Sequence, residues 1–212
     1  MPPIVRLVVY SDFLCPWCWN AATRLASVHQ SLGPAVAIEW KSYLLRPQPE
    51  PGRDLEKFRA YTQGWLRVAE DEPRAPFVPW ASDAGPPSHS VPAHSVAKAA
   101  RALGEDAGAR MRERLFRGYF TESRDISDRA TLAALWREAG LDGDAFAASE
   151  DPAIVRQVFA DHDEALAYGA TGVPAARLAE HDFVIVGAQP EAVYQRWLTR
   201  ALAAASGEAV AR

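Results

Sequence analysis

The sequence predicts an α/β fold, because strand-like segments lie near both ends of the chain and helix-like segments fill the middle. The apolar run 4–10 indicates a buried strand, 16–32 has a helical pattern, and 36–44 alternates apolar and polar residues as a strand does. Such a strand–helix–strand unit predicts a parallel strand pair with a right-handed crossover. Strand character returns only at 174–179 and 183–186, which fit a hairpin before a last helix.

The residues between the two strand-bearing ends predict a large helical insertion. After a proline-rich connector, 53–70 has the composition of a helix, and a second proline-rich loop covers 73–92. Apolar stripes at helical spacing then follow one another with little strand between them. We therefore expect one sheet-bearing domain formed by 1–50 and 170–212, interrupted by an inserted helical domain at 51–169.

Composition places the chain among ordinary globular proteins and argues against several other classes. Its 212 residues are 49% hydrophobic and 24% charged, and the net charge of −4 gives no support for a nucleic-acid-binding surface. No apolar run reaches the about 18 residues that indicate a membrane-spanning helix. The beginning of the chain lacks the basic region and apolar core of a signal peptide, so we expect a cytoplasmic protein with no membrane partner.

Both cysteines lie where the first strand passes into the first helix, in the segment Cys15-Pro16-Trp17-Cys18. Cys15 occupies the expected N-cap position, and Pro16 fits the first helical position, where its missing N–H costs nothing. Unpaired N–H groups and the positive end of the helix dipole favour the thiolate of Cys15, which is the nucleophilic form. Cys18 follows at a spacing that places side chains about 5–6 Å apart, within reach of a disulfide. The pattern predicts a dithiol that opens and closes.

Two other interpretations of the cysteine pair are open. A zinc site needs about four ligands, and among the histidines only His89 and His94 have a spacing near that of a ligand pair. Two inert cysteines that only pack in the core are the other alternative. The redox interpretation is favoured, because a Cys-x-x-Cys pair at a strand-to-helix junction is typical of thioredoxin-like proteins. We therefore expect no bound metal.

The segment Gly172-Val173-Pro174 supports the redox interpretation, because it lies where the helices end and the strands resume. In a thioredoxin-like arrangement we expect the Val173–Pro174 peptide to be cis and to lie against the cysteine pair. A cis X-Pro bond there would turn the Val173 backbone outward to pair with an extended substrate. The alternative is a simple turn into an edge strand.

These motifs resemble those of the DsbA family of thioredoxin-fold oxidoreductases, in particular its cytoplasmic FrnE-like branch. The resemblance implies a thioredoxin fold with a large all-helical insertion between the βαβ half and the ββα half. It also implies that Cys15 is the attacking thiol, Cys18 the resolving thiol and Pro174 the cis proline. The matching segments occur in the family's order: DFLCPWC at 12–18, PAH at 92–94, LFRGYF at 115–120, RDISD at 124–128, GLD at 140–142, GVP at 172–174 and GAQP at 187–190.

The same superfamily includes 2-hydroxychromene-2-carboxylate isomerases and kappa-class glutathione transferases, which this chain resembles in layout. Those enzymes typically have serine in place of Cys15 and use glutathione, so Cys15 with Cys18 argues against that branch. A glutathione-dependent isomerase or transferase is the alternative function. Glutathione is a candidate co-substrate, and no metal, flavin or nucleotide cofactor is expected, since the sequence has no glycine-rich phosphate loop. The chain departs from its relatives after Pro174, with Ala175-Ala176-Arg177.

Three further residues are candidates for the site. Asp12 ends the first strand close to the cysteines, where its carboxylate is either a proton relay or a turn residue. Trp17 is expected at the helix start, where it either contacts an apolar substrate, together with Pro16 and Val173, or packs half-buried. His94 opens a helix of the insertion and either reaches the thiols and the substrate or has a structural role.

The sequence thus predicts a thiol–disulfide oxidoreductase that acts on a protein or small molecule bearing a disulfide or a thiol. A glutathione-using enzyme predicts instead that activity survives the loss of Cys18. A non-enzymatic alternative is a chaperone-like binder that uses the helical face and tolerates the loss of Cys15. The direction of the reaction, the recycling partner and the oligomeric state do not follow from the sequence.

Overall fold

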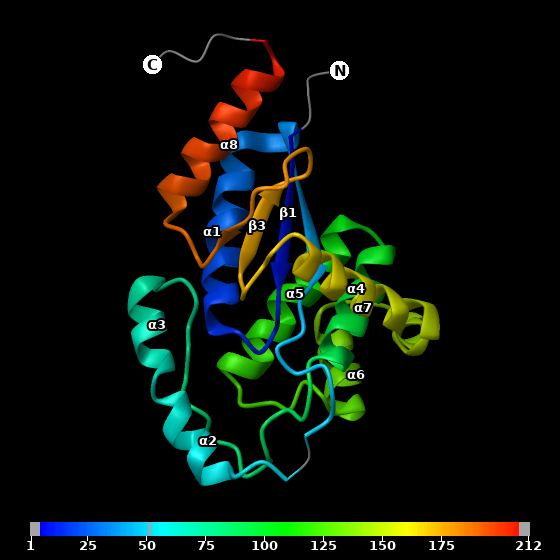
Figure 1. Ribbon diagram of the computed structural model, residues 1–212. Coiled ribbons are helices and arrows are strands. Elements are labelled where there is room, and N and C mark those ends of the chain that lie inside the picture. The colour runs from blue at the N-terminus through cyan, green and yellow to red at the C-terminus, as the bar shows by residue number, and fades with distance from the viewer. Residues whose placement is uncertain (1–4, 51, 208–212) are drawn as a thin grey trace.

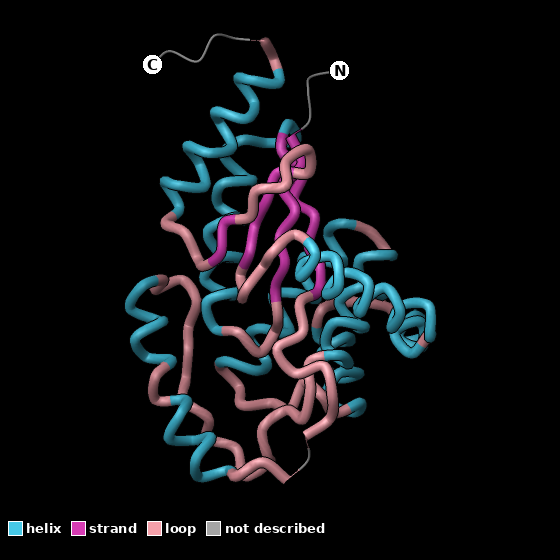
Figure 2. Tube along the Cα trace, in the orientation of Figure 1, coloured by secondary structure: helices cyan, strands magenta, loops and turns pink. Residues whose placement is uncertain are grey.

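A computed structural model describes residues 5–50 and 52–207 and shows a mixed sheet with helices on both faces (Figure 1). The strand order is β2-β1-β3-β4; β1 pairs with β2 in parallel and with β3 antiparallel, and β3 and β4 are antiparallel. Figure 2 shows these strands gathered in one layer, although they come from the two ends of the chain. The strands are β1 (Val5–Ser11), β2 (Val36–Ser42), β3 (Ala175–Leu178) and β4 (Ile185–Val186).

The central strand β1 is buried on both faces, because its alternate side chains enter two separate cores. Leu7 and Val9 pack in the core beneath helices α1 (Pro16–Leu32) and α8 (Glu191–Ala205). Val8 and Tyr10 pack on the opposite face, against Ala165 and Ala170. The strand that leads to the cysteine pair is therefore fixed from both sides.

The helical insertion runs from the end of β2 to the start of β3 and has its own aromatic core. Trp19, one residue after Cys18, joins this core and lies 5.0 Å from the Phe77 ring centroid and 5.9 Å from that of Phe120. Helix α1 thus packs against the sheet on one side and against the insertion on the other. The insertion contains α2 (Leu55–Thr62), α3 (Trp65–Asp71), α4 (Val91–Ala102), α5 (Glu105–Phe120), α6 (Arg129–Glu138), the 3-10 helix η2 (Gly143–Glu150) and α7 (Pro152–Ala167).

A buried ion network fastens α3 to α1. The Arg24 guanidinium donates from Nε to Glu72 at 3.0 Å and from Nη2 to Asp71 at 2.6 Å, and Nη1 donates to the Gln189 carbonyl at 3.1 Å. Hydrogen bonds from Arg74 and then from Arg24 lower the pKa of Glu72 to about 2. The carboxylate therefore stays ionised and holds the insertion against α1.

A second network of ion pairs and hydrogen bonds, which includes Arg177, fastens α7 to the sheet. Glu164 accepts from the Tyr10 hydroxyl at 2.6 Å, from Lys41 Nζ at 2.6 Å and from Arg177 Nη2 at 3.3 Å. The Arg177 guanidinium also lies 3.7 Å from the Tyr168 ring centroid. Arg177, the third residue after the predicted cis proline, thus pairs with a carboxylate of the insertion.

The predicted thioredoxin fold, with a helical insertion between its two halves, is confirmed, but several boundaries were wrong. The single helix predicted at 53–70 is broken into α2 and α3 at Gly64, a residue of low helix propensity. Strand β2 ends at Ser42 rather than residue 44, because the N–H groups of Ser42 and Leu44 donate to Asp161 and His162 of α7. The hairpin is shorter than expected, with β3 at 175–178 and β4 at 185–186.

The expected domain boundaries at 1–50, 51–169 and 170–212 stay a prediction, although α2 to α7 all fall within the middle range. The predicted start of the first strand at residue 4 lies outside the described residues. No helix in the described part of the chain is long and apolar enough to cross a membrane.

Candidate active site

A tight turn between β1 and α1 places both cysteines. Asp12 organises this turn, because its side-chain Oδ1 accepts from the Leu14 N–H at 2.7 Å and its carbonyl accepts from the Cys15 N–H at 3.1 Å. Such local pairing by an Asp side chain is typical of a turn that precedes a helix. Pro16 at the first helical position then starts α1.

Cys15 is the N-cap residue of α1, as the sequence predicted, with extended backbone angles of φ −97° and ψ 115°. Its sulfur makes no capping hydrogen bond to the first turn; it donates to the Val173 carbonyl at 3.3 Å. The residue is 6% exposed, so it is nearly covered but keeps contact with the surface. The thiol of Cys15 is therefore held by the loop that precedes β3.

Cys18 lies one turn further along α1 and is fully buried, with 0% exposure. Its sulfur accepts from the Asp12 backbone N–H at 3.5 Å, and its own N–H donates to the Cys15 carbonyl at 3.1 Å. Burial and, after it, the adjacent Cys15 thiol raise the pKa of the Cys18 thiol well above its usual value. Both cysteines are free, buried thiols, and Cys15 is the slightly more exposed of the two.

The Val173–Pro174 peptide bond is cis, which confirms the prediction made from the sequence. Val173 is half-buried, and its carbonyl faces the Cys15 sulfur. The Pro174 carbonyl accepts from the Gly187 N–H at 2.7 Å, so the loop is tied to the turn that follows β4. The cysteine pair and the proline loop, 158 residues apart in sequence, therefore meet at one place.

The outer oxygen of Asp12 joins the turn to the insertion. Oδ2 accepts from the Leu45 N–H at 2.6 Å and from the Ser90 hydroxyl at 2.7 Å, and the residue is 0% exposed. With the Leu14 N–H, this carboxylate accepts three hydrogen bonds, while its contact with Cys18 is made by the backbone. These contacts favour the turn interpretation of Asp12; its role as a proton relay stays a prediction.

His94 of α4 lies beside Asp12 and not beside the sulfurs. Its Nε2 is 4.0 Å from Asp12 Oδ2, and its ring centroid is 5.0 Å from that of Phe13. No hydrogen bond to either cysteine is recorded for this histidine within the described ranges. Its proposed contact with the thiols or the substrate therefore stays a prediction.

The remaining candidates have clear positions. Trp17 is 42% exposed at the start of α1, as predicted, and Pro16 beside it is half-buried. The His89 ring shares a hydrogen bond of 2.8 Å with the neighbouring Ser88 hydroxyl. In the described part of the chain, no group of three or more His, Cys, Asp or Glu residues could hold a metal ion.

Sequence reasoning missed Ser90 as a partner of Asp12. The available signal was the position of Ser90 directly before Val91, where α4 starts.

Comparisons with known proteins agree with this geometry. The family described as DSBA-like thioredoxin domain matches residues 6–199. The cytosolic disulfide reductase DsbM from Pseudomonas aeruginosa, which has also been solved with GSH, is 25% identical. The structural match covers 93% of this chain and 98% of the DsbM chain, with a TM-score of 0.74.

Two further solved structures extend the comparison. A probable DsbA oxidoreductase from Streptomyces coelicolor is 28% identical, with a TM-score of 0.72 over 98% of this chain and 92% of that chain. A 2-hydroxychromene-2-carboxylate isomerase shares the fold at 19% identity, with a TM-score of 0.67 over 95% of this chain and 98% of that chain. Since the family match spans nearly the whole chain, the protein belongs to the family of DSBA-like thioredoxin domains.

Proposed function

We propose that this protein is a thiol–disulfide oxidoreductase in which Cys15 attacks and Cys18 resolves. One observation carries the proposal: two free thiols at the start of α1 meet a cis-proline loop whose Val173 carbonyl binds the Cys15 sulfur. The difference in exposure supports the division of roles, because only Cys15 keeps any contact with the surface. An attacking sulfur must reach the substrate, whereas a resolving sulfur must reach only its neighbour.

In the reducing direction, the Cys15 thiolate attacks one sulfur of a substrate disulfide. A Cys15–substrate disulfide forms, and the other substrate sulfur leaves as a thiolate that takes up a proton. Cys18, once deprotonated, attacks the Cys15 sulfur and releases the remaining substrate thiolate. Two electrons have then passed to the substrate, and Cys15 and Cys18 are joined by a disulfide. A thiol such as glutathione would return the pair to the dithiol in two exchange steps.

The Val173 backbone is proposed to bind the substrate. While Cys15 is a thiol, its S–H group donates a hydrogen bond to the Val173 carbonyl, with 3.3 Å between sulfur and oxygen. Once the sulfur has formed a mixed disulfide, it has no proton to donate, and the carbonyl is free for a backbone N–H of an extended substrate. Trp17, exposed beside Pro16, supplies apolar surface next to the same sulfur.

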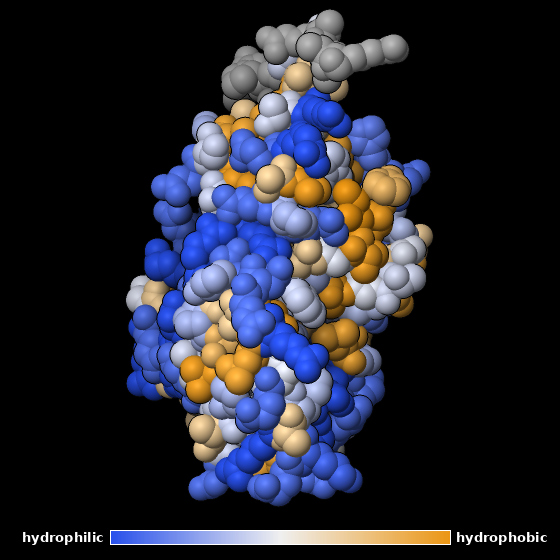
Figure 3. All heavy atoms as spheres, turned by 90° about the vertical axis from the view of Figure 1, so that its left-hand side faces the viewer, coloured by the Kyte–Doolittle hydropathy of each residue, from blue (hydrophilic) through white to orange (hydrophobic). Residues whose placement is uncertain are grey.

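We further propose the reducing direction and a cytoplasmic location. DsbM, a cytosolic disulfide reductase, supports both, and its structure with GSH supports glutathione as co-substrate. On the face in Figure 3, which bears on the chaperone-like alternative, the apolar side chains form separate patches among hydrophilic ones. A protein that binds unfolded chains would be expected to expose broader apolar surface.

The test is a disulfide-reduction assay with glutathione on the wild type, Cys15→Ser and Cys18→Ser. We expect Cys15→Ser to lose turnover, and Cys18→Ser to lose turnover while mass spectrometry detects a stable mixed disulfide at Cys15. Equal activity in all three proteins would overturn the proposal. Activity that survives in Cys18→Ser would favour a glutathione-dependent isomerase or transferase.

A further inference from the structure

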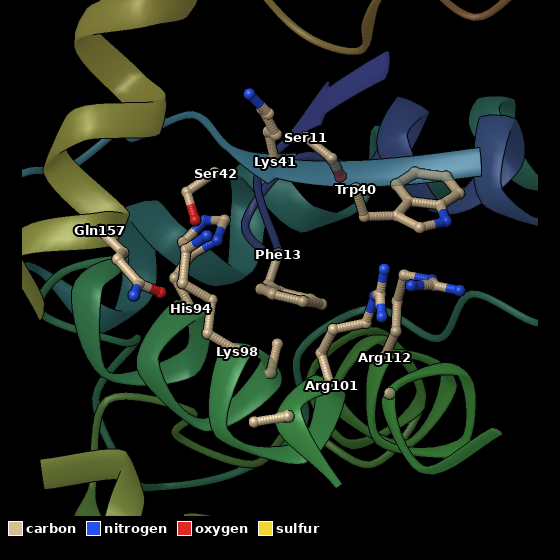
Figure 4. Close-up of a pocket in the computed structure, with 13 residues that line it drawn as sticks. Ser11, Phe13, Trp40, Lys41, Ser42, His94, Lys98, Arg101, Arg112 and Gln157 are labelled. Atoms are coloured by element: carbon tan, nitrogen blue, oxygen red, sulfur yellow. The ribbon is translucent and has the colours of Figure 1, made fainter. Parts of the chain in front are cut away.

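A cavity lies between strand β2 and helices α4 and α5. Its volume is about 300 Å³, and its walls include Phe13, Trp40, His94, Arg101 and Arg112. Figure 4 shows Arg101 and Arg112 extending from their helices toward Trp40, with Phe13 at the centre of the view. Neither cysteine lines this cavity.

The cations around the cavity differ in whether a carboxylate neutralises them. Lys98 pairs with Asp161 at 2.5 Å, and Arg101 pairs with Glu105 at 2.5 Å. Lys41, which points away from the cavity in Figure 4, is paired with Glu164, as described above. The guanidinium of Arg112, in contrast, has no ion pair or side-chain hydrogen bond with any residue in the ranges 5–50 and 52–207.

The guanidinium of Arg112 instead stacks over the Trp40 ring, 4.4 Å from its centroid. Burial, and next the nearby charge of Arg101, lower the pKa of Arg112 to about 10, so the group stays charged at neutral pH. A half-buried guanidinium with no carboxylate partner provides donors in a fixed planar geometry, which suits a bidentate anion such as a carboxylate.

His94 is a buried residue that contributes to the cavity wall. The residue is 4% exposed, and its Nε2 atom has no hydrogen-bond partner among the described residues. The Asp12 oxygen 4.0 Å away is too distant for a hydrogen bond. Leaving a buried polar atom unpaired costs about 1–3 kcal/mol, but Nε2 is enclosed by protein and is not exposed to the cavity.

We propose that this cavity binds a small organic anion with an apolar body. Its carboxylate lies on the Arg112 guanidinium, and its body packs against Phe13 and Trp40. The ligand enters past Trp40, Arg101 and Arg112, because a neighbouring surface hollow shares these residues with the cavity. This site stands apart from the proposed thiol chemistry, since its key residues do not contact the sulfurs.

The test uses benzoate as the probe, benzamide as its neutral counterpart and inorganic phosphate as an anion without an apolar body. Binding is measured by calorimetry and by the shift of the Trp40 indole N–H resonance, assigned with Trp40→Phe. We expect saturable binding of benzoate that weakens about tenfold or more in Arg112→Gln, because the charge-assisted pair is lost. Arg117→Gln, on the same helix but paired with Glu113, is the matched control.

Benzoate binding should be unchanged in Arg117→Gln, and disulfide reduction should be unchanged in Arg112→Gln. The proposal is overturned if benzoate does not bind, if benzamide binds equally well, or if Arg112→Gln binds benzoate like the wild type. Tighter binding of phosphate than of benzoate would overturn the assignment of an apolar body.

Discussion

The turn at 12–14 separates two regions that differ in how their polar atoms are paired. On the cysteine side, the Cys15 sulfur donates to the Val173 carbonyl and the Cys18 sulfur accepts from the Asp12 N–H. On the cavity side, the Arg112 guanidinium and His94 Nε2 have no partner in the described ranges. Both sides meet at the same turn, and the polar groups named on the second side leave hydrogen-bonding capacity unused.

The difference distinguishes a site of covalent chemistry from a site of binding. A dithiol carries its reactive groups itself, so its sulfurs can be hydrogen-bonded within the protein until a substrate disulfide binds. A binding cavity keeps its donors unpaired, because their pairing is what the ligand contributes. The turn residue Asp12 is shared, since its backbone contacts Cys18 and its carboxylate faces Ser90 and the insertion.

The largest effect is expected from Asp12→Ala, which removes the shared element. The change leaves the buried donors Leu14 N–H, Leu45 N–H and Ser90 Oγ without their acceptor. We expect unfolding free energy to fall by about 3–5 kcal/mol, measured by urea denaturation, since each orphaned donor is costly. Asp83→Ala, at an exposed ion pair, is the control and should stay within about 0.5 kcal/mol of the wild type. A loss below that of Ser90→Ala would contradict the role of Asp12 as the shared element.

A smaller loss, about 2 kcal/mol, is expected for Ser90→Ala, because the hydroxyl no longer donates to Asp12 or accepts from the Arg46 N–H, while Leu45 still donates to the carboxylate. Ser90 belongs to the insertion side, so this change tests whether the two regions can be separated. Chemical denaturation measures the stability, and alkylation by iodoacetamide measures the Cys15 thiol. The alkylation rate should be unchanged; a large increase would show that the regions are not independent.

The cysteine side was largely predictable from the sequence, because its signals are local. Cys15 followed by Pro16 gives the start of α1, and Gly33, at φ +67°, stops it where the pattern predicted. The cis bond before Pro174 followed from the thioredoxin-like arrangement. What the sequence did not indicate was that the Val173 carbonyl would bind the Cys15 thiol, since this depends on how the two ends of the chain dock.

The cavity side could not be predicted, because its properties come from partners distant in the chain. Ser90 reaches Asp12 across 78 residues, and no spacing rule connects them. Arg112 lies in a helix rich in charged residues, where an arginine is usually a solvated side chain. Only the fold shows that the Trp40 ring covers this arginine. It also shows that the neighbouring cations Lys98 and Arg101 on α4 pair with carboxylates.

The burial of Cys18 predicts a loss of stability at alkaline pH. Its pKa is raised in the folded protein, so the unfolded chain loses this proton first as pH passes 9.0, the ordinary value. The contribution is therefore fully present below pH 9 and is progressively lost as pH rises above it. Urea denaturation from pH 8 to pH 10 under reducing conditions should show a flatter decline in Cys18→Ala than in the wild type. Parallel declines would show that the Cys18 thiol ionises alike in both states.

The smallest effect on the fold is expected for Trp17→Ala, because this side chain is exposed beside Cys15. Stability should change by no more than about 0.5 kcal/mol, as is usual for surface positions. The same change should raise KM for an apolar peptide disulfide by about threefold to tenfold with little change in kcat, because apolar contact area for the substrate is lost. Leu66→Ala, similarly exposed on α3, is the control and should leave KM unchanged. An equal KM in Trp17→Ala and the wild type would place substrate contact at the Val173 backbone alone.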